Sequence, residues 1–118
     1  MHLSYIKPHW PYVVPAPYAG MYSPQDALPL VRSDDELRDP HPIYGAMTHH
    51  RVSRTFTQPQ VRDAVMVGYM GLIKQIDDEL GRLFAFMDAQ GLTQETMVVF
   101  CADHGDFLGD HWLGEKEM

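Results

Sequence analysis

The distribution of proline is the feature that most restricts how this chain can fold. All nine prolines of the 118-residue sequence lie between residues 8 and 59. Proline fixes its own φ angle, lacks an amide proton and disfavours the helical region for the residue before it. We therefore predict a short alternating strand at residues 2–6, followed by mostly irregular chain over residues 7–56, with a short helix near residues 33–38.

The second half of the sequence carries one long helical pattern. Thr57 and Gln60 have the spacing of a capping box, and Gly91 has the position of a C-terminal cap. Between them, apolar residues recur in steps of three and four, which is the spacing of one helical face. The residues of this stripe are Val61, Val65, Tyr69, Leu72, Ile76, Leu80, Leu83 and Met87. We predict a helix over residues 57–90 that packs on a sheet; a coiled-coil seam is the alternative.

A short turn and an apolar segment follow the helix. Residues 96–102 are rich in β-branched and aromatic side chains and are predicted to form a buried strand that includes Cys101 as a small apolar residue. A helix, a short loop and a buried strand form one limb of an α/β unit. The expected fold class is therefore α/β, with parallel sheet strands, one long helix and a long proline-rich irregular segment. Parallel sheets bind ligands beyond the carboxyl ends of their strands.

An Asp-His-Gly sequence stands directly after the second predicted strand. The carboxylate of Asp103 and the imidazole of His104 are ligand types that suit Ca²⁺, Mn²⁺ or Zn²⁺. Neighbouring residues on a strand point to opposite faces. Both side chains can therefore bind one ion only if the strand ends at Asp103 and the backbone turns, which Gly105 permits. The alternative is a solvated loop in which the aspartate acts as a cap.

A histidine and a lysine follow the first predicted strand. His9 lies between Pro8 and Pro11, and an imidazole can donate a proton to a leaving oxygen. The alternative for His9 is a loop histidine stacked on Trp10, and the alternative for Lys7 is a solvent-facing side chain. A second basic group, His49 and His50 with Arg51 and Arg54, could bind an anion, or could be a solvated loop.

Three segments together resemble a known family. The stretch 98–106 (Val-Val-Phe-Cys-Ala-Asp-His-Gly-Asp), with Gly109-Asp110-His111 and Lys116, is similar to the metal-binding segment of the sulfatase and phosphonate monoester hydrolase family, within the alkaline phosphatase superfamily. The stretch 6–12 (Ile-Lys-Pro-His-Trp-Pro-Tyr) is similar to the Lys-Pro-His-x-Pro segment of the same enzymes. The helix between them, ending at residues 77–83, resembles the helix that the family has in that place.

The resemblance implies a function and a set of roles. Residues 1–118 would be a central fragment of a sulfatase-type catalytic domain with a partial alkaline-phosphatase-like sandwich, in which residues 103–118 form the metal and substrate loop. The implied metal ligands are Asp103 and His104, the catalytic residues are His9 and Lys116, and the substrate-binding residues are Lys7 and His111. The family also implies a formylglycine nucleophile, from a cysteine or serine, and an acidic pair of metal ligands. The sequence lacks both of these features.

The composition limits the classes of partner that this chain is expected to bind. The formal net charge of −7 argues against nucleic-acid binding, and the apolar runs are shorter than the roughly 20 residues of a membrane span. The single cysteine fits a cytoplasmic, reducing location. We expect a small anionic ester as substrate and leave the number of subunits open. The alternatives to an enzyme segment are a truncated, non-catalytic remnant and a helical interaction module built on the stripe.

Overall fold

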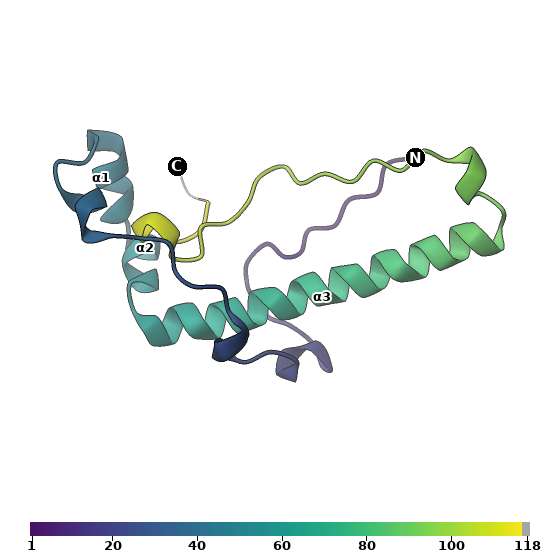
Figure 1. The fold of residues 1–118 in the computed structure, drawn as a ribbon, viewed down its shortest axis with the longest axis horizontal. Coiled ribbons are helices and arrows are strands. Elements are labelled where there is room, and N and C mark those ends of the chain that lie inside the picture. Colours follow the sequence, from purple (N-terminus) through teal and green to yellow (C-terminus); the bar gives the residue numbers. More distant parts are fainter. Residues whose placement is uncertain (117–118) are drawn as a thin grey trace. The chain divides into compact units, whose positions relative to one another are not determined.

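The computed structural model describes residues 1–116 as helices joined by loops (Figure 1). The α-helices are α1 (Pro42–Thr48), α2 (Arg51–Phe56) and α3 (Pro59–Ala89). Short 3₁₀ turns separate the loops; they are η1 (Tyr18–Gly20), η2 (Pro24–Asp26), η3 (Asp34–Leu37), η4 (Thr93–Glu95) and η5 (Asp110–Trp112). None of the helices in residues 1–116 combines the length and apolar character that crossing a bilayer requires.

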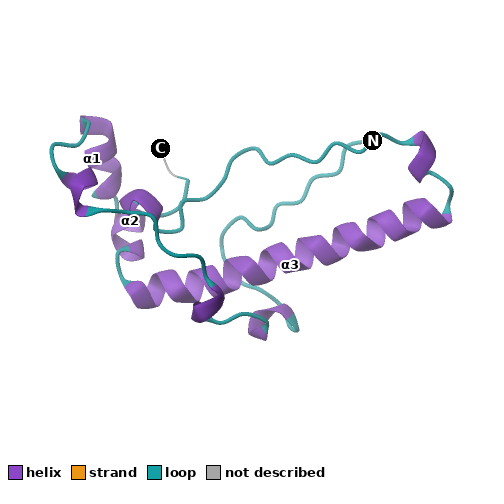
Figure 2. Ribbon diagram, viewed as in Figure 1, coloured by secondary structure: helices purple, strands orange, loops and turns teal. Residues whose placement is uncertain are grey.

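The prediction of an α/β fold with a parallel sheet is wrong. Residues 2–6 and 96–102 are loops, and residues 1–116 contain no strand (Figure 2). Alternation and β-branched composition give only a tendency, because a strand also needs a neighbouring strand to accept and donate its backbone hydrogen bonds. The apolar segment is consequently open to solvent: the exposed fraction is 88% for Met97 and 74% for Phe100, and Cys101 is exposed rather than buried.

The chain divides into two compact units. The first unit comprises Met1–Tyr22 and Gly68–Cys101, and the second comprises Ser23–Val67 and Ala102–Met118. The last two residues of the second unit, which also end the predicted 103–118 loop, lie outside the described residues. Lys7 and His9 therefore belong to the first unit, whereas Asp103, His104, His111 and Lys116 belong to the second.

Helix α3 lies within two residues of the predicted range, but its caps differ in part from the prediction. Gly91 has a φ of 68°, and the Leu92 amide donates to the Met87 carbonyl at 2.9 Å, which is the hydrogen bond of a Schellman-type end. At the other end, the Thr57 hydroxyl donates to the Arg54 carbonyl at 2.7 Å and closes α2. The predicted capping box is thus replaced by a C-terminal contact of the preceding helix.

The apolar stripe of α3 packs on the proline-rich segment in the first unit. Leu72 is only 1% exposed. Gly68 and Gly71 allow the close approach, because a Cβ added to either would lie 2.9 Å from the carbonyl oxygen of Tyr12 or Tyr18, respectively. The rings of Tyr12 and Tyr69 meet edge to face at 6.1 Å. The chain's own N-terminal segment therefore takes part of the position expected for a sheet.

The second unit has a small core and two helices that were not expected. Phe56, Leu108 and Leu113 are buried there. Helix α1 begins with Pro42, and the His41 ring accepts the Ile43 amide at 3.3 Å. Proline is well tolerated at the first helical position because that amide has no partner within the helix. Residues 42–48 lie in the proline-rich segment that was predicted to be mostly irregular, and this prediction is wrong for α1.

Candidate functional site

The side chains of Asp103 and His104 lie together at a bend of the second unit. Nε2 of His104 is 3.5 Å from Oδ2 of Asp103, and the His104 amide donates to Oδ1 of Asp103 at 2.9 Å. The backbone bends at Asp103, as a shared ligand site requires, although the strand that was expected to deliver it is absent from residues 1–116. Both side chains are open to solvent, so the contact between them contributes little stability by itself.

The imidazole of His104 is oriented by the next residue. Nδ1 of His104 lies 2.7 Å from the carbonyl oxygen of Gly105. A carbonyl oxygen can only accept, so Nδ1 carries the proton and Nε2 of the neutral ring has a free lone pair. A hydrogen bond of this kind fixes the tautomer of a metal-binding histidine. Nε2, the free nitrogen, is also the one that faces the Asp103 carboxylate.

A divalent cation fits this pair as part of its coordination sphere. One carboxylate oxygen and one imidazole nitrogen are suitable donors for Ca²⁺, Mn²⁺ or Zn²⁺. Within residues 1–116, no group of three or more histidine, cysteine or acidic side chains is arranged to hold a metal. Asp103 and His104 would supply at most two ligands to such an ion, and other groups would have to fill its remaining positions.

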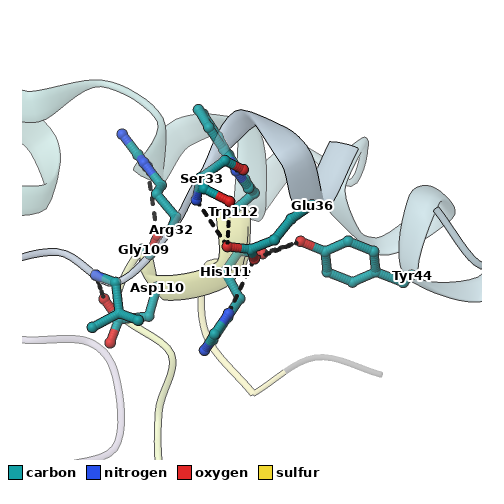
Figure 3. A network of polar contacts seen from close by, with 9 residues as sticks. Arg32, Ser33, Glu36, Tyr44, Gly109, Asp110, His111 and Trp112 are labelled. Atoms are coloured by element: carbon teal, nitrogen blue, oxygen red, sulfur yellow. Dashed lines mark hydrogen bonds and ion pairs between the residues drawn. The ribbon is translucent and has the colours of Figure 1, made fainter. Parts of the chain in front are cut away.

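The loop after the Asp-His pair is fastened to residues 31–36 of the same unit (Figure 3). The His111 amide donates to the Val31 carbonyl at 2.8 Å, and the Val31 amide donates to Oδ1 of Asp110 at 2.9 Å. The indole N–H of Trp112 donates to the Ser33 carbonyl at 2.7 Å. We refer to residues 31–36, Tyr44 and residues 109–113 as the clasp.

Side chains close the clasp further. Nδ1 of His111 lies 3.0 Å from Oε2 of Glu36, and the Tyr44 hydroxyl donates to the His111 carbonyl at 2.7 Å. Desolvation raises the pKa of the Glu36 carboxyl, but the hydrogen bonds from His111 and Ser33 outweigh this effect and hold that pKa below its usual value. Desolvation, reinforced by the Glu36 charge, raises the pKa of Tyr44. The carboxylate of Asp110, the residue before His111, accepts the Val31 amide.

The backbone of the clasp is strained. His111 and Trp112 have φ angles of 51° and 60°, in the left-handed region that side chains larger than glycine rarely adopt. Such a conformation costs on the order of 1–3 kcal/mol per residue and persists only where its surroundings enforce it. The guanidinium of Arg32 lies 4.3 Å from the centre of the Trp112 ring and helps to fix the indole.

Helix α2 supports the chain that leads to Lys116. The Gly114 amide donates to the Ser53 hydroxyl at 3.2 Å, and a Cβ on Gly114 would lie 2.7 Å from Cγ1 of Val52. Lys116 follows two residues later and is half-buried. Sequence reasoning selected His111 and Lys116 but missed Glu36, Tyr44 and Ser53. No local pattern marks those three residues, because each acts through a partner more than 60 residues away.

In the first unit, Lys7 and His9 are held by their own loop. Nζ of Lys7 donates to the carbonyls of His9 at 3.1 Å and Pro11 at 2.6 Å. Nδ1 of His9 donates to the Trp10 carbonyl at 2.7 Å, and the two rings stack at 6.3 Å. The stacked loop histidine, one of the alternatives for His9, is therefore observed. A pocket shared by His9, Lys116 and the Asp103–His104 pair stays a prediction.

Comparison with known proteins gives a consistent set of relatives. The Sulfatase family model matches residues 1–117. The multifunctional alkaline phosphatase superfamily protein PehA of Trinickia caryophylli is 36% identical over 126 aligned residues, which cover 96% of this chain and 24% of that protein. An arylsulfatase of Clostridium perfringens is 29% identical, with 94% of this chain and 23% of that protein covered. A choline-sulfatase of Rhizobium meliloti is 28% identical, with 97% and 22% covered. The chain thus spans about a quarter of the length of these relatives.

Proposed function

Because this chain belongs to the sulfatase family, we propose that it forms part of the catalytic domain of a metal-dependent hydrolase of sulfate, phosphate or phosphonate monoesters. The relatives named above include an arylsulfatase and a choline-sulfatase. The substrate would be a small anionic ester. The observation that best supports this proposal is the Asp103–His104 pair, with Nε2 of His104 facing the carboxylate.

In this proposal, Asp103 and His104 bind a divalent cation. The cation, when bound, neutralises charge on the ester oxygens and activates the nucleophile. The structure supports these roles by two contacts: the Gly105 carbonyl holds Nδ1 of His104, and the Asp103 carboxylate stands beside Nε2. Ca²⁺, Mn²⁺ and Zn²⁺ are the candidate ions, and Asp103 favours the harder ones.

The other predicted site residues act on the ester. His9, protonated, would donate from Nε2 to the leaving oxygen, since its Nδ1 is occupied by the Trp10 carbonyl. The Lys116 ammonium would contact the anionic oxygens and stabilise the charge that develops on the transferring group. Lys7 keeps one of its three ammonium donors for the substrate, because two contact backbone carbonyls. His111 would line the pocket from the clasp.

No nucleophile is assigned within this chain. The resembling family forms its formylglycine from a cysteine or serine in a Cys-x-Pro-x-Arg or Ser-x-Pro-x-Arg sequence. Cys101 is followed by Ala-Asp-His-Gly, which does not match that pattern. We therefore expect the 118-residue chain alone not to hydrolyse monoesters at an enzymatic rate, since the covalent step has no attacking group.

Manganese binding tests the proposed ligands directly. Titration of the chain with Mn²⁺, followed by electron paramagnetic resonance, should show a weak site that His104→Ala and Asp103→Asn both remove. His2→Ala and Asp34→Asn are the matched controls, because they make the same side-chain changes at exposed positions outside the site. Unchanged Mn²⁺ affinity in both site variants would contradict the metal assignment.

A hydrolysis assay tests the expected inactivity. The purified chain is incubated with an aryl sulfate, an aryl phosphate and an aryl phosphonate, with Mn²⁺, Ca²⁺ or Zn²⁺ added. Residual acid catalysis by His9 would supply about 10²–10⁴-fold, which is small against the 10⁶-fold or more of enzymes. Multiple turnovers that His104→Ala abolishes would show instead that the 118 residues are sufficient.

A further inference from the structure

A polar hollow of about 450 Å³ lies at the junction of α1, α2 and α3 in the second unit. Its lining residues are His49, Arg51, Arg54, Thr55, Thr57 and Gln58. Among the described residues no carboxylate lines this hollow, although the chain as a whole has a net charge of −7. The volume falls within the range of about 300–1,000 Å³ typical of small-molecule sites.

The two arginines of the hollow differ from the other arginines of the described chain. Each of the others has a carboxylate, carbonyl or ring partner: Arg32 binds carbonyls and the Trp112 ring, Arg38 pairs with Asp35, Arg62 binds the Leu28 carbonyl, and Arg82 pairs with Glu79. In residues 1–116, the guanidinium groups of Arg51 and Arg54 have no such partner. The guanidinium groups of Arg51 and Arg54 therefore line the same hollow without a neutralising partner among the described residues.

Helix geometry places these two cations together. Arg51 and Arg54 are three residues apart in α2, so their side chains lie on one helical face. The nearby hydroxyls do not compete for an anion, because Thr55 donates to the Arg51 carbonyl at 2.9 Å and Thr57 donates to the Arg54 carbonyl at 2.7 Å. The guanidinium groups are thus the principal donors, and the Gln58 amide is a further one.

We propose that Arg51 and Arg54 form a binding site for a dianionic oxyanion group, the phosphate of a phosphomonoester, carried on an organic molecule. Each guanidinium presents parallel N–H donors that match two oxygens of such a group. Two like charges three residues apart on a helix repel each other, and a bound dianion removes that repulsion. The hollow also leaves room for the organic part. None of these residues has a role in the ester hydrolysis proposed above.

Calorimetric titration at constant ionic strength tests the site. The probes are inorganic phosphate, inorganic sulfate, phenyl phosphate and acetate, added to the 118-residue chain. We expect phosphate and sulfate to bind, phenyl phosphate to bind more tightly than either, and acetate to bind weakest. The variant Arg51→Ala/Arg54→Ala should lower the phosphate affinity by about tenfold or more, as expected for lost charge-assisted hydrogen bonds. Arg38→Ala/Arg82→Ala removes the same charge elsewhere and should change affinity by less than about twofold.

Three results would overturn the proposal: no phosphate binding by the wild-type chain, an equal loss in both double variants, or acetate binding as tightly as phosphate. If Arg51→Ala/Arg54→Ala does not fold, as judged by circular dichroism, the wild-type chain decides the question. Its Arg51 and Arg54 Nε–H resonances should then shift on adding phosphate more than those of Arg38 and Arg82. Equal shifts at all four arginines would show non-specific attraction. The Mn²⁺ experiment on Asp103 and His104 is independent, so either proposal can fail alone.

Discussion

Nδ1 of His111 lies 3.0 Å from Oε2 of Glu36, although the two residues are separated by 75 positions in the sequence. The Tyr44 hydroxyl connects both partners, donating to the His111 carbonyl and lying 3.3 Å from the same Glu36 oxygen. The pair therefore joins η3, α1 and η5 within the second unit. It fastens the segment that carries the strained residues His111 and Trp112.

The Glu36–His111 pair should make the clasp sensitive to acid. The pKa of Glu36 is lower in the folded chain than in the unfolded chain, so its stabilising effect is complete above the ordinary value of about 4.3 and is lost as the pH falls through the folded value. We expect protection of the His111 amide from hydrogen exchange to fall as the pH drops below about 4.3. Glu36→Gln should remove this dependence and lower protection at pH 6 by about two- to fivefold, the range for solvent-exposed pairs.

Asp35→Asn is the matched control for this measurement. Asp35 lies in the same 3₁₀ turn and pairs with Arg38 at 3.1 Å on the open surface. It removes the same charge without touching His111, so protection of the His111 amide should keep its acid dependence. An equal loss in Asp35→Asn and Glu36→Gln would show that overall charge, rather than the specific pair, controls the clasp.

Local features of the fold were predictable from the sequence, and features that depend on distant partners were not. The stripe from Val61 to Met87 located α3, because periodicity is a property of a continuous segment. The segments at residues 2–6 and 96–102 have strand-like composition. A strand also needs a neighbouring strand to pair with, and the sequence of the segment itself does not show whether one is present. Helix α1 was not predicted because the proline-rich composition around it indicated irregular chain. Pro42 is nevertheless compatible with a helix, since it occupies the first helical position.

The same distinction applies to the candidate site. Asp103 and His104 are adjacent, so a bend at Asp103 could be predicted from the Asp-His-Gly sequence. The sequence around Glu36 indicates only a capping box with Ser33, and Glu36 does fill that role. Nothing in this local pattern indicates a contact with His111. The cap is a local contact, whereas the contact between the same carboxylate and His111 depends on tertiary packing.

Substitution of the glycines of α3 tests the close packing of this helix on the proline-rich segment. Gly71→Ala places a methyl group 2.9 Å from the Tyr18 carbonyl and 3.0 Å from Cγ2 of Val14. We expect it to lower the free energy of unfolding by about 1–3 kcal/mol, as overpacking does. Gly81→Ala is the control, because its Cβ would meet no atom within 4 Å, and it should stabilise the helix by up to about 1 kcal/mol. Urea denaturation followed by circular dichroism measures both; stabilisation by Gly71→Ala would contradict the packing.

Substitution of Gly114 tests the contact between α2 and the chain segment that leads to Lys116. An alanine Cβ there would lie 3.0 Å from the backbone nitrogen of Ser53, which cannot move without displacing the helix. Gly114→Ala should therefore break the hydrogen bond from its amide to the Ser53 hydroxyl and destabilise the second unit by about 1–3 kcal/mol. Gly105→Ala, with open space around its Cβ, should change stability by less than about 0.5 kcal/mol. Equal effects of the two substitutions in the same denaturation experiment would refute this contact.

The exposed apolar segment at residues 97–100 should make the chain associate. Its backbone groups are not paired in a ladder within residues 1–116, and its side chains are apolar, which is the combination that promotes edge-to-edge pairing of chains. We expect sedimentation velocity to show concentration-dependent oligomers that Val99→Lys reduces, because a lysine on such a segment opposes pairing. Val13→Lys is the matched control, since Val13 is 72% exposed and Val99 is 74% exposed. If both lysines reduce association equally, net charge rather than the 97–100 segment governs it.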